Sequence, residues 1–312
     1  MKIFNSISTS KNYKRASIAI GNFDGTHKGH QKVFRYAKKF AQKNKTKFGV
    51  LTFTPLPVMF FNKKVNNYKL TSENQKFLLF KKHGVDFVIN IKFNKTFSKI
   101  TAEKFISNII YKKVNPKLIF VSNNFKFGNK RKGNVNLLKK YSKKYNYKLL
   151  KIIPLKYKKK IISSTRIRKC LQKGHIELAN RLLSRTWNID GRVKKGKKLG
   201  RKLGYRTCNI NIKNYVLPKA GIYVVKVLIG DKKKIHNGVA YLGNRPTFEG
   251  KKIFLEVYIF DIKKNLYKKT LKIYFIKFLR EDKKFKNSAK LVDQMKNDVI
   301  FAKKGLKTKL VL

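Results

Sequence analysis

Acidic residues, cysteine, proline and tryptophan are all scarce in this sequence. Its 312 residues include 14 Asp and Glu against 78 Lys and Arg, with two Cys, six Pro and one Trp. Two cysteines are too few for a disulfide framework or for a zinc site built on cysteine. So few carboxylates also leave little material for a carboxylate-rich metal cage or for the paired acids of a glycosidase.

Long apolar runs are missing as well. No apolar stretch reaches the roughly 18 residues of a membrane-spanning helix. The first residues, MKIFNSISTSKNYK, lack the apolar stretch of a signal peptide. These features predict a soluble cytoplasmic protein. Hydrophobic residues still make up 42% of the chain, which is enough for a sizeable core in two domains or one large one.

The net charge of +64 has two interpretations. A nucleic-acid-binding protein would gain affinity from phosphate contacts. Alternatively, the composition has drifted toward Lys, Asn, Ile, Phe and Tyr on solvated faces. Drift is favoured, because the basic runs KKYSKKY, KYKKK and KKGKK are short and scattered, without a basic arm, zinc-finger or RRM signature. We therefore expect no specific nucleic-acid partner and no membrane partner, whereas small anionic substrates would be attracted in either case.

The first half alternates predicted strands and helices. Apolar runs that suit buried strands lie at residues 17–20, 48–53, 86–91, 117–122 and 148–153. Helical patterns lie between them; the first places on one face Val33, Phe34, Ala37, Phe40 and Ala41. This alternation predicts an α/β fold with a parallel, Rossmann-type sheet.

The second half consists of strand-rich segments separated by Gly, Pro and Asn. Helix is sparse until residues 287–304. The pattern predicts an antiparallel β-barrel with a closing C-terminal helix. Because a helical pattern gives way to strands between residues 180 and 188, we predict domains at 1–184 and 185–312.

The segment IAIGNFDGTHKGHQ, residues 18–31, joins a predicted strand to a predicted helix through a glycine-rich turn. Backbone N–H groups of such a turn, and of the helix N-terminus, bind anions. His27 and His30 could bond phosphate oxygens there without a metal. Two nearby histidines alone would be weak evidence, because surface histidines are as common. The T/H-x-G-H core, however, is typical of nucleotidylyltransferases, in which the histidines stabilise charge on the α-phosphate of ATP as pyrophosphate leaves.

A second segment, ISSTRIR at residues 162–168, combines two serines, a threonine and two arginines at a predicted loop-to-helix boundary. Hydroxyl and guanidinium groups at such a boundary suit phosphate binding. The alternative is an N-cap serine followed by a basic helix.

The whole sequence resembles the prokaryotic bifunctional riboflavin kinase/FMN adenylyltransferase (FAD synthetase) family. The resemblance covers nearly the whole chain, and no single motif carries it. The matching segments, in order, are GNFDGTHKGHQ, LTFTPLP, NFKFG, ISSTRIR, LGRKLGYRTCNI, GIY, GNRPTF, LEVYIFD and FLREDKKF.

For the first half, the resemblance implies a nucleotidyltransferase-like α/β domain that joins FMN and ATP to give FAD and pyrophosphate. His27 and His30 would be catalytic. The residues implied in binding ATP and its phosphates are Gly21, Phe23, Asp24, Gly29, Ser163, Ser164, Thr165, Arg166 and Arg168. The residues implied in binding flavin are Pro55, Pro57, Asn124, Phe125 and Phe127.

For the second half, the resemblance implies a riboflavin kinase barrel that makes FMN from riboflavin and ATP. Thr207 and Asn209 would hold Mg²⁺ with the ATP phosphates, and Glu256 would be the catalytic base. The glycine loop on the phosphate side would comprise Gly196, Gly200, Arg201 and Gly204. No tightly bound prosthetic group is implied. Judged by itself, Glu256 could also be an ordinary outward-facing strand residue.

Several positions depart from the family pattern. Leu56 stands where the family usually has histidine, and Arg206 and Cys208 replace the proline and alanine of its Pro-Thr-Ala-Asn motif. Lys268 stands where glycine is usual, and Ser122 where glycine is frequent. Since proline would fix the backbone before Thr207, we expect slower kinase activity rather than none. Two alternatives remain: only one activity is live, or the chain is a basic RNA-associated protein on the same scaffold.

Overall fold

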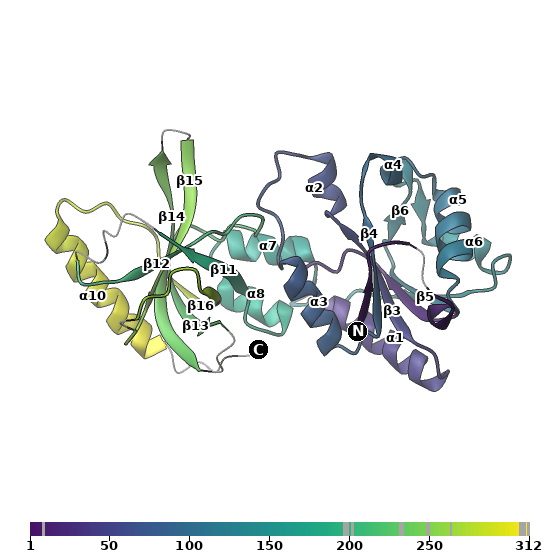
Figure 1. Cartoon of the computed structure of the whole chain (residues 1–312), viewed down its shortest axis with the longest axis horizontal. Helices are drawn as coiled ribbons and strands as arrows, with labels where there is room; N and C mark the ends of the chain where they lie inside the picture. The colour runs from purple at the N-terminus through teal and green to yellow at the C-terminus, as the bar shows by residue number, and fades with distance from the viewer. Residues whose placement is uncertain are drawn as a thin grey trace. The chain divides into compact units, whose positions relative to one another are not determined.

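The chain folds into two compact units, each described here by itself. Unit 1 comprises residues 1–66 and 73–163, and unit 2 comprises residues 67–72 and 164–312 (Figure 1). The structure, a computed structural model, describes residues 1–7, 10–195, 200, 203–230, 234–247, 250–262, 264–305 and 310. The predicted functional domains, 1–184 and 185–312, stay a prediction; as compact units, residues 67–72 and 164–184 group with the second half.

Unit 1 is built on a six-stranded sheet of order β1-β4-β3-β2-β5-β8, in which every neighbouring pair is parallel. The strands are β1 (Lys2–Phe4), β2 (Ser17–Ile20), β3 (Phe48–Thr54), β4 (Phe87–Lys92), β5 (Leu118–Ser122) and β8 (Lys148–Ile152). The central strands are buried on both faces, as parallel strands between helices are. The predicted parallel α/β fold is therefore confirmed, with β1 as an additional edge strand.

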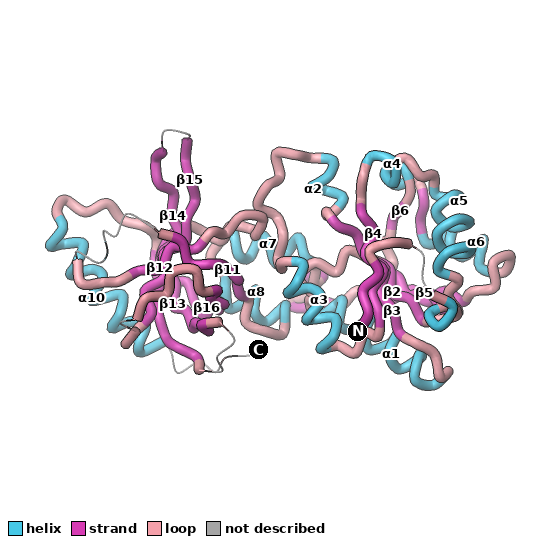
Figure 2. Tube along the Cα trace, in the orientation of Figure 1, coloured by secondary structure: helices cyan, strands magenta, loops and turns pink. Residues whose placement is uncertain are grey.

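Helices pack on both faces of this sheet (Figure 2). They are α1 (Lys28–Lys43), α2 (Pro57–Phe61), α3 (Glu73–Lys82), α4 (Lys95–Ser98), α5 (Ala102–Lys104), the π-helix η2 (Phe105–Val114) and α6 (Val135–Ser142). Along β2, Ile18 and Ile20 join one apolar cluster while Ala19 joins the other, because alternate side chains leave opposite faces. Helix α1 buries the predicted apolar face, although Phe40 is only half-buried.

Short elements complete unit 1. Two small antiparallel pairs are formed by β6 (Lys126–Phe127) with β7 (Gly133–Asn134), and by β9 (Lys156–Tyr157) with β10 (Lys160–Ile161). Two 3₁₀ turns, η1 (Lys11–Tyr13) and η3 (Asn129–Arg131), lie between longer elements.

Unit 2 contains a closed antiparallel barrel of order β11-β12-β15-β14-β13-β16. Its strands are β11 (Asn188–Lys194), β12 (Thr207–Ile210), β13 (Gly221–Ile229), β14 (Ile235–Thr247), β15 (Gly250–Ile259) and β16 (Thr270–Arg280). Its helices are α7 (Ser164–Gln172), α8 (Ile176–Leu183) and α10 (Ser288–Gly305). The predicted barrel with a C-terminal helix is confirmed.

Residues 67–72 belong to unit 2 although they come from the first half of the sequence. The indole N–H of the buried Trp187 donates to the Leu70 carbonyl at 2.8 Å. The backbone N–H of Val216 donates to the Lys69 carbonyl, also at 2.8 Å. This strap could not be read from the sequence, because it is held by backbone carbonyls and carries no side-chain pattern of its own.

Candidate functional site

A loop of residues 21–27, called the glycine loop below, joins β2 to α1. Phe23, Gly25 and Thr26 all have positive φ, at 50°, 78° and 37°, so the backbone winds tightly. The Thr26 hydroxyl and N–H both donate to the Phe23 carbonyl. Glycine at position 29 leaves room for the His27 ring, because a Cβ there would lie only 3.0 Å from it. The loop therefore positions the start of α1, with both histidines, directly after the end of β2.

His27 and His30 stack on each other, with ring centroids 3.6 Å apart and planes 21° apart. His27 is the N-cap of α1, and its Nδ1 accepts the backbone N–H of His30 at 3.4 Å. The edge of the His30 ring meets the Phe23 ring at 5.1 Å. Two imidazoles at the N-terminus of a 16-residue helix form a site suited to an anion. Asp24 is buried in the same loop.

The predicted flavin residues lie in segments that follow neighbouring strands at the same edge of the sheet. Pro55 and Pro57 follow β3, and residues 124–127 follow β5, while the glycine loop follows β2 between them. Because these three neighbouring strands are parallel, their carboxyl ends meet at one edge. The chain also reverses its order across the sheet between β2 and β5, and ligands of such sheets bind at that switch point.

The flavin residues themselves differ in exposure. Phe125 and Phe127 stack with centroids 5.5 Å apart; Phe127 is buried in the core, whereas Phe125 is half-buried and Asn124 is exposed. Pro57 is the first residue of α2, and the buried Leu56 is its N-cap without a side-chain hydrogen bond. The leucine thus fills apolar space at a position where the family usually has histidine.

The ISSTRIR segment contains the boundary between the two units. Ser163 is the last residue of unit 1, and Ser164 begins helix α7 in unit 2. Thr165 is exposed and Arg166 half-buried. Arg168 is buried, its guanidinium lies 3.7 Å from the centroid of the Tyr68 ring, and its Nε donates to the Tyr68 carbonyl at 2.8 Å. These contacts give Arg168 a structural partner, and its contact with phosphate stays a prediction.

In unit 2, three predicted kinase residues share one face of the barrel wall. Asn209 on β12 is paired with Glu256 on β15, and Thr207 with Tyr258, so Thr207, Asn209 and Glu256 are neighbours. The flanking Leu255 and Val257 are fully buried, which turns Glu256 to the opposite, outer face. The ladder fixes this register whether or not proline precedes Thr207, and Arg206 itself is exposed.

Gly200, one of the predicted phosphate-side glycines, lies beside Thr207. A Cβ on Gly200 would lie 2.4 Å from the Tyr205 carbonyl oxygen and 3.2 Å from the Thr207 Oγ1, so only glycine allows this approach. Gly204 has φ of 83°. Gly196 and Arg201 lie outside the described residues. Burial raises the pKa of the Cys208 thiol to about 11, which keeps it a protonated, inert strand residue at neutral pH.

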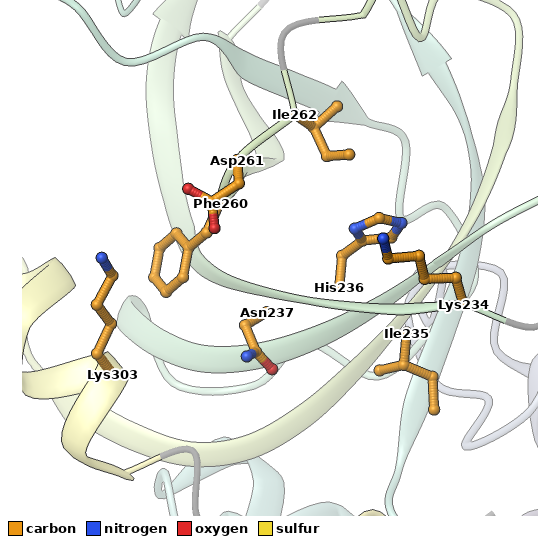
Figure 3. A pocket seen from close by; sticks show the side chains of 8 residues that line it. All are labelled: Lys234, Ile235, His236, Asn237, Phe260, Asp261, Ile262 and Lys303. Atoms are coloured by element: carbon orange, nitrogen blue, oxygen red, sulfur yellow. The ribbon is translucent and has the colours of Figure 1, made fainter.

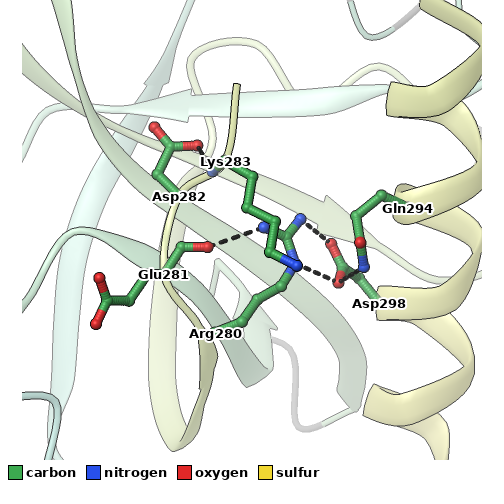
Figure 4. Close-up of polar contacts among 6 residues, drawn as sticks. All are labelled: Arg280, Glu281, Asp282, Lys283, Gln294 and Asp298. Carbon is green, nitrogen blue, oxygen red and sulfur yellow. Dashed lines mark hydrogen bonds and ion pairs between the residues drawn. The ribbon is translucent and has the colours of Figure 1, made fainter. Parts of the chain in front are cut away.

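Two features of unit 2 gave no signal in the sequence. One is a cavity of about 410 Å³, and Figure 3 shows the side chains that line it: Lys234, Ile235, His236, Asn237, Phe260, Asp261, Ile262 and Lys303. Figure 4 shows Arg280 at the end of β16 paired with Asp298 of α10, at 2.8 and 2.7 Å. Gln294, one turn before Asp298, donates to the same carboxylate at 3.1 Å. These partners are 18 residues apart, so only the fold reveals the pair.

In the part of the chain that the structure describes, no helix is long and apolar enough to cross a membrane. Family models match the chain twice, as FAD synthetase over residues 9–166 and as riboflavin kinase over residues 183–306.

Full-length relatives agree. The bifunctional riboflavin kinase/FMN adenylyltransferase of Buchnera aphidicola subsp. Schizaphis graminum is 40% identical over 97% of this chain and 98% of its own length. The protein of the same name from Escherichia coli K12 is 32% identical, covering 92% and 91%. A crystal structure described as a macrolide-efflux protein from Streptococcus pneumoniae matches with a TM-score of 0.84 at 29% identity, covering 96% and 98% of the two chains. This chain therefore belongs to the bifunctional riboflavin kinase/FMN adenylyltransferase family.

Proposed function

We propose that the chain makes FMN from riboflavin in unit 2 and FAD from FMN in unit 1, using ATP in both reactions. The observation that supports the proposal is that each unit brings its own predicted site residues together: the glycine loop with two stacked histidines in one, and Thr207, Asn209 and Glu256 in the other. The excess of positive charge assists both, because ATP and FMN are anions.

In unit 1, the FMN phosphate attacks the α-phosphate of ATP, a new P–O bond forms, and pyrophosphate leaves. Charge accumulates on the α-phosphate oxygens during this step. The side chains of His27 and His30, at the N-terminus of α1, would donate hydrogen bonds to it. The stacked rings restrict each other, so little reorganisation is needed when charge develops. Ser163, the last residue of unit 1, would add a hydroxyl donor for the remaining phosphates.

Flavin recognition in unit 1 would use the loops after β3 and β5. The half-buried Phe125, whose ring stacks on the buried Phe127, offers an aromatic face, and Pro55 and Pro57 offer a rigid apolar wall. Asn124 is exposed and can donate or accept hydrogen bonds. This arrangement would orient the FMN phosphate toward the glycine loop, which lies on the strand between them.

In unit 2, the ribityl 5′-hydroxyl of riboflavin attacks the γ-phosphate of ATP and ADP leaves. Glu256 accepts the hydroxyl proton as general base. The Thr207 hydroxyl and the Asn209 amide oxygen are hard oxygen donors on the same face, and this donor set fits Mg²⁺. Bound with ATP, Mg²⁺ would neutralise charge on the phosphates. Gly200 lets the backbone at that position lie close to Thr207.

The direct test is to incubate the purified chain with riboflavin, ATP and Mg²⁺ and to separate FMN from FAD over time. The proposal expects FMN first and FAD afterwards, and it expects added FMN to give FAD without riboflavin. A chain that forms FMN but never FAD, or uses only added FMN, would have a single live activity. Omission of the divalent metal should stop FMN formation.

A further inference from the structure

The first turn of α3 places a lysine side chain inside unit 1, linked to the glycine loop through one other side chain. Lys76 is only 5% exposed, whereas Lys81 and Lys82 of the same helix are exposed. Burying an ammonium group carries a large desolvation cost, so a core position is an unfavourable place for lysine unless its partners compensate. Apolar packing would hold α3 on the sheet without this cost.

A hydrogen-bond chain connects this lysine to the loop backbone. Lys76 Nζ donates to Thr52 Oγ1 at 3.3 Å, and Thr52 Oγ1 donates to the Asn22 carbonyl at 3.2 Å. Thr52 is completely buried on β3. Asn22 lies between Gly21 and Phe23, where the loop turns into positive φ. Phe23 in turn contacts the His30 ring. The hydrogen bonds from Lys76 therefore reach the backbone next to a residue that packs against a predicted catalytic histidine.

The same turn of α3 is also linked to the end of β3, which Pro55 and Pro57, the prolines predicted to contact flavin, follow. Glu73, three residues before Lys76, accepts a hydrogen bond from Asn90 Nδ2 at 3.0 Å. The Oδ1 atom of Asn90 accepts one from the Thr54 hydroxyl at 2.9 Å. Thr54 directly precedes Pro55. Thr52 and Thr54 lie two residues apart on β3 and thus on one face, each linked to the first turn of α3.

We propose that Lys76 is a positioning residue for adenylyl transfer: acting through Thr52, its ammonium holds the Gly21–Phe23 backbone so that His27 and His30 meet the α-phosphate of ATP. This inference rests on the FMN adenylyltransferase activity proposed for unit 1. Lys76 itself need not touch ATP. Its loss lets the loop drift, and displacements of about 1 Å can cost on the order of a hundredfold in rate.

Lys76→Met tests the role, since methionine keeps an unbranched chain of similar length and removes the donor. Lys81→Met is the matched control, because it removes the same charge from an exposed position of the same helix. We expect Lys76→Met to lower kcat for FAD formation from FMN about 10–100-fold, with KM for FMN little changed and FMN formation from riboflavin unaffected. Lys76→Arg, which keeps a donor, should retain more activity than Lys76→Met.

Thr52→Val removes the hydroxyl that links Lys76 to the Asn22 carbonyl, and it should reproduce much of the fall in kcat for FAD formation. Combined with Lys76→Met it should add little, because the two residues act in one chain. If the double variant shows the product of the two single falls in kcat, the residues act separately, which would contradict the proposed link through Thr52. The melting temperature of Lys76→Met should stay equal or rise. A lower melting temperature with FAD formation within twofold of the parent would show that Lys76 only fastens α3, and would overturn the proposal.

Hydrogen exchange of the peptide spanning residues 18–31 gives a readout independent of turnover. Lys76→Met should speed exchange there relative to the parent and to Lys81→Met, without speeding exchange in unit 2. Unchanged exchange in the peptide would overturn the proposal even if activity falls. If the parent makes no FAD but the peptide still exchanges faster in Lys76→Met, the support of the loop stands and the proposed function fails instead.

Discussion

At the scale of single residues, the departures from the family pattern have different structural consequences. Leu56 is buried and Cys208 half-buried, whereas Arg206 is exposed beside a strand whose register is fixed by pairing. Lys268 is different. It has φ of 63°, a left-handed conformation that glycine adopts freely and other residues adopt at a cost. The glycine that is usual in the family is therefore explained by the backbone.

Lys268→Gly should stabilise unit 2. The relief of left-handed strain, about 1–2 kcal/mol per residue, exceeds the entropy that glycine adds to the unfolded chain, about 0.4–1 kcal/mol, so a net gain of roughly 0.5–1 kcal/mol is expected. Denaturant unfolding followed by the fluorescence of Trp187, the one tryptophan of the chain, measures it within the same unit. Lys269→Gly, next in sequence and without positive φ, should destabilise; equal effects at both positions would refute the argument.

At the scale of elements, the strong periodic segments were predictable and the polar packing was not. Strand β3, predicted at 48–53, ends at Thr54, and the C-terminal helix, predicted at 287–304, covers Ser288–Gly305. Such segments are set by apolar patterns that are local in sequence. Helix α3 shows the limit, since Gln75 and Lys76 are buried while Leu78 is 60% exposed. Its buried face combines these two polar side chains with the apolar Phe80, and hydrophobic periodicity cannot reveal the polar part.

The kinase site also has one part that the sequence predicted and one part that it did not. The identity of Thr207, Asn209 and Glu256 came from motifs, but their adjacency depends on the pairing of β12 with β15, some 50 residues apart, which no local pattern encodes. The histidines differ, because His27 and His30 are brought together by the first turn of one helix. Their closeness therefore followed from spacing alone.

Asp298→Asn should loosen helix α10 from the barrel. The side chains of Arg280 and Asp298 are 17% and 5% exposed, and removing the charge leaves a buried guanidinium without its counter-ion. Breaking such a pair costs about 3 kcal/mol or more. Asp293→Asn is the control: its 3.8 Å pair with Lys296 is mostly exposed, and such pairs contribute about 0–1 kcal/mol. Equal losses of unfolding free energy in the two variants would contradict the structural role given to Arg280–Asp298.

At the scale of the whole molecule, the units are more interleaved in sequence than a two-domain division suggests. Residues 67–72 leave the first half to join unit 2, where Leu70 and Lys69 accept hydrogen bonds from Trp187 and Val216. A boundary placed only by the change from helices to strands misses this strap. The barrel thus depends on a segment that lies more than 90 residues before α7 in the chain.

The net charge of +64 is a property of the whole molecule too. If it reflects compositional drift, nucleic acid should bind weakly, without sequence preference, and affinity should fall steeply as salt rises, because only phosphate contacts contribute. Fluorescence anisotropy with several unrelated RNAs across a salt series measures this. Tight binding of one RNA at physiological salt, with others excluded, would contradict the drift interpretation.

The central claim is that two separate sites carry out two reactions, and variants that separate the reactions test it most directly. His30→Ala removes a donor to the α-phosphate, a loss that typically costs about 10²–10³ in rate, and should stop FAD while FMN still accumulates. Glu256→Gln removes the base, worth about 10²–10⁴, and should stop FMN formation while added FMN is still converted to FAD. Both rates are measured for both variants after each is shown to be folded. If His30→Ala spares FAD formation, or Glu256→Gln spares phosphorylation of riboflavin, the corresponding site is wrongly assigned.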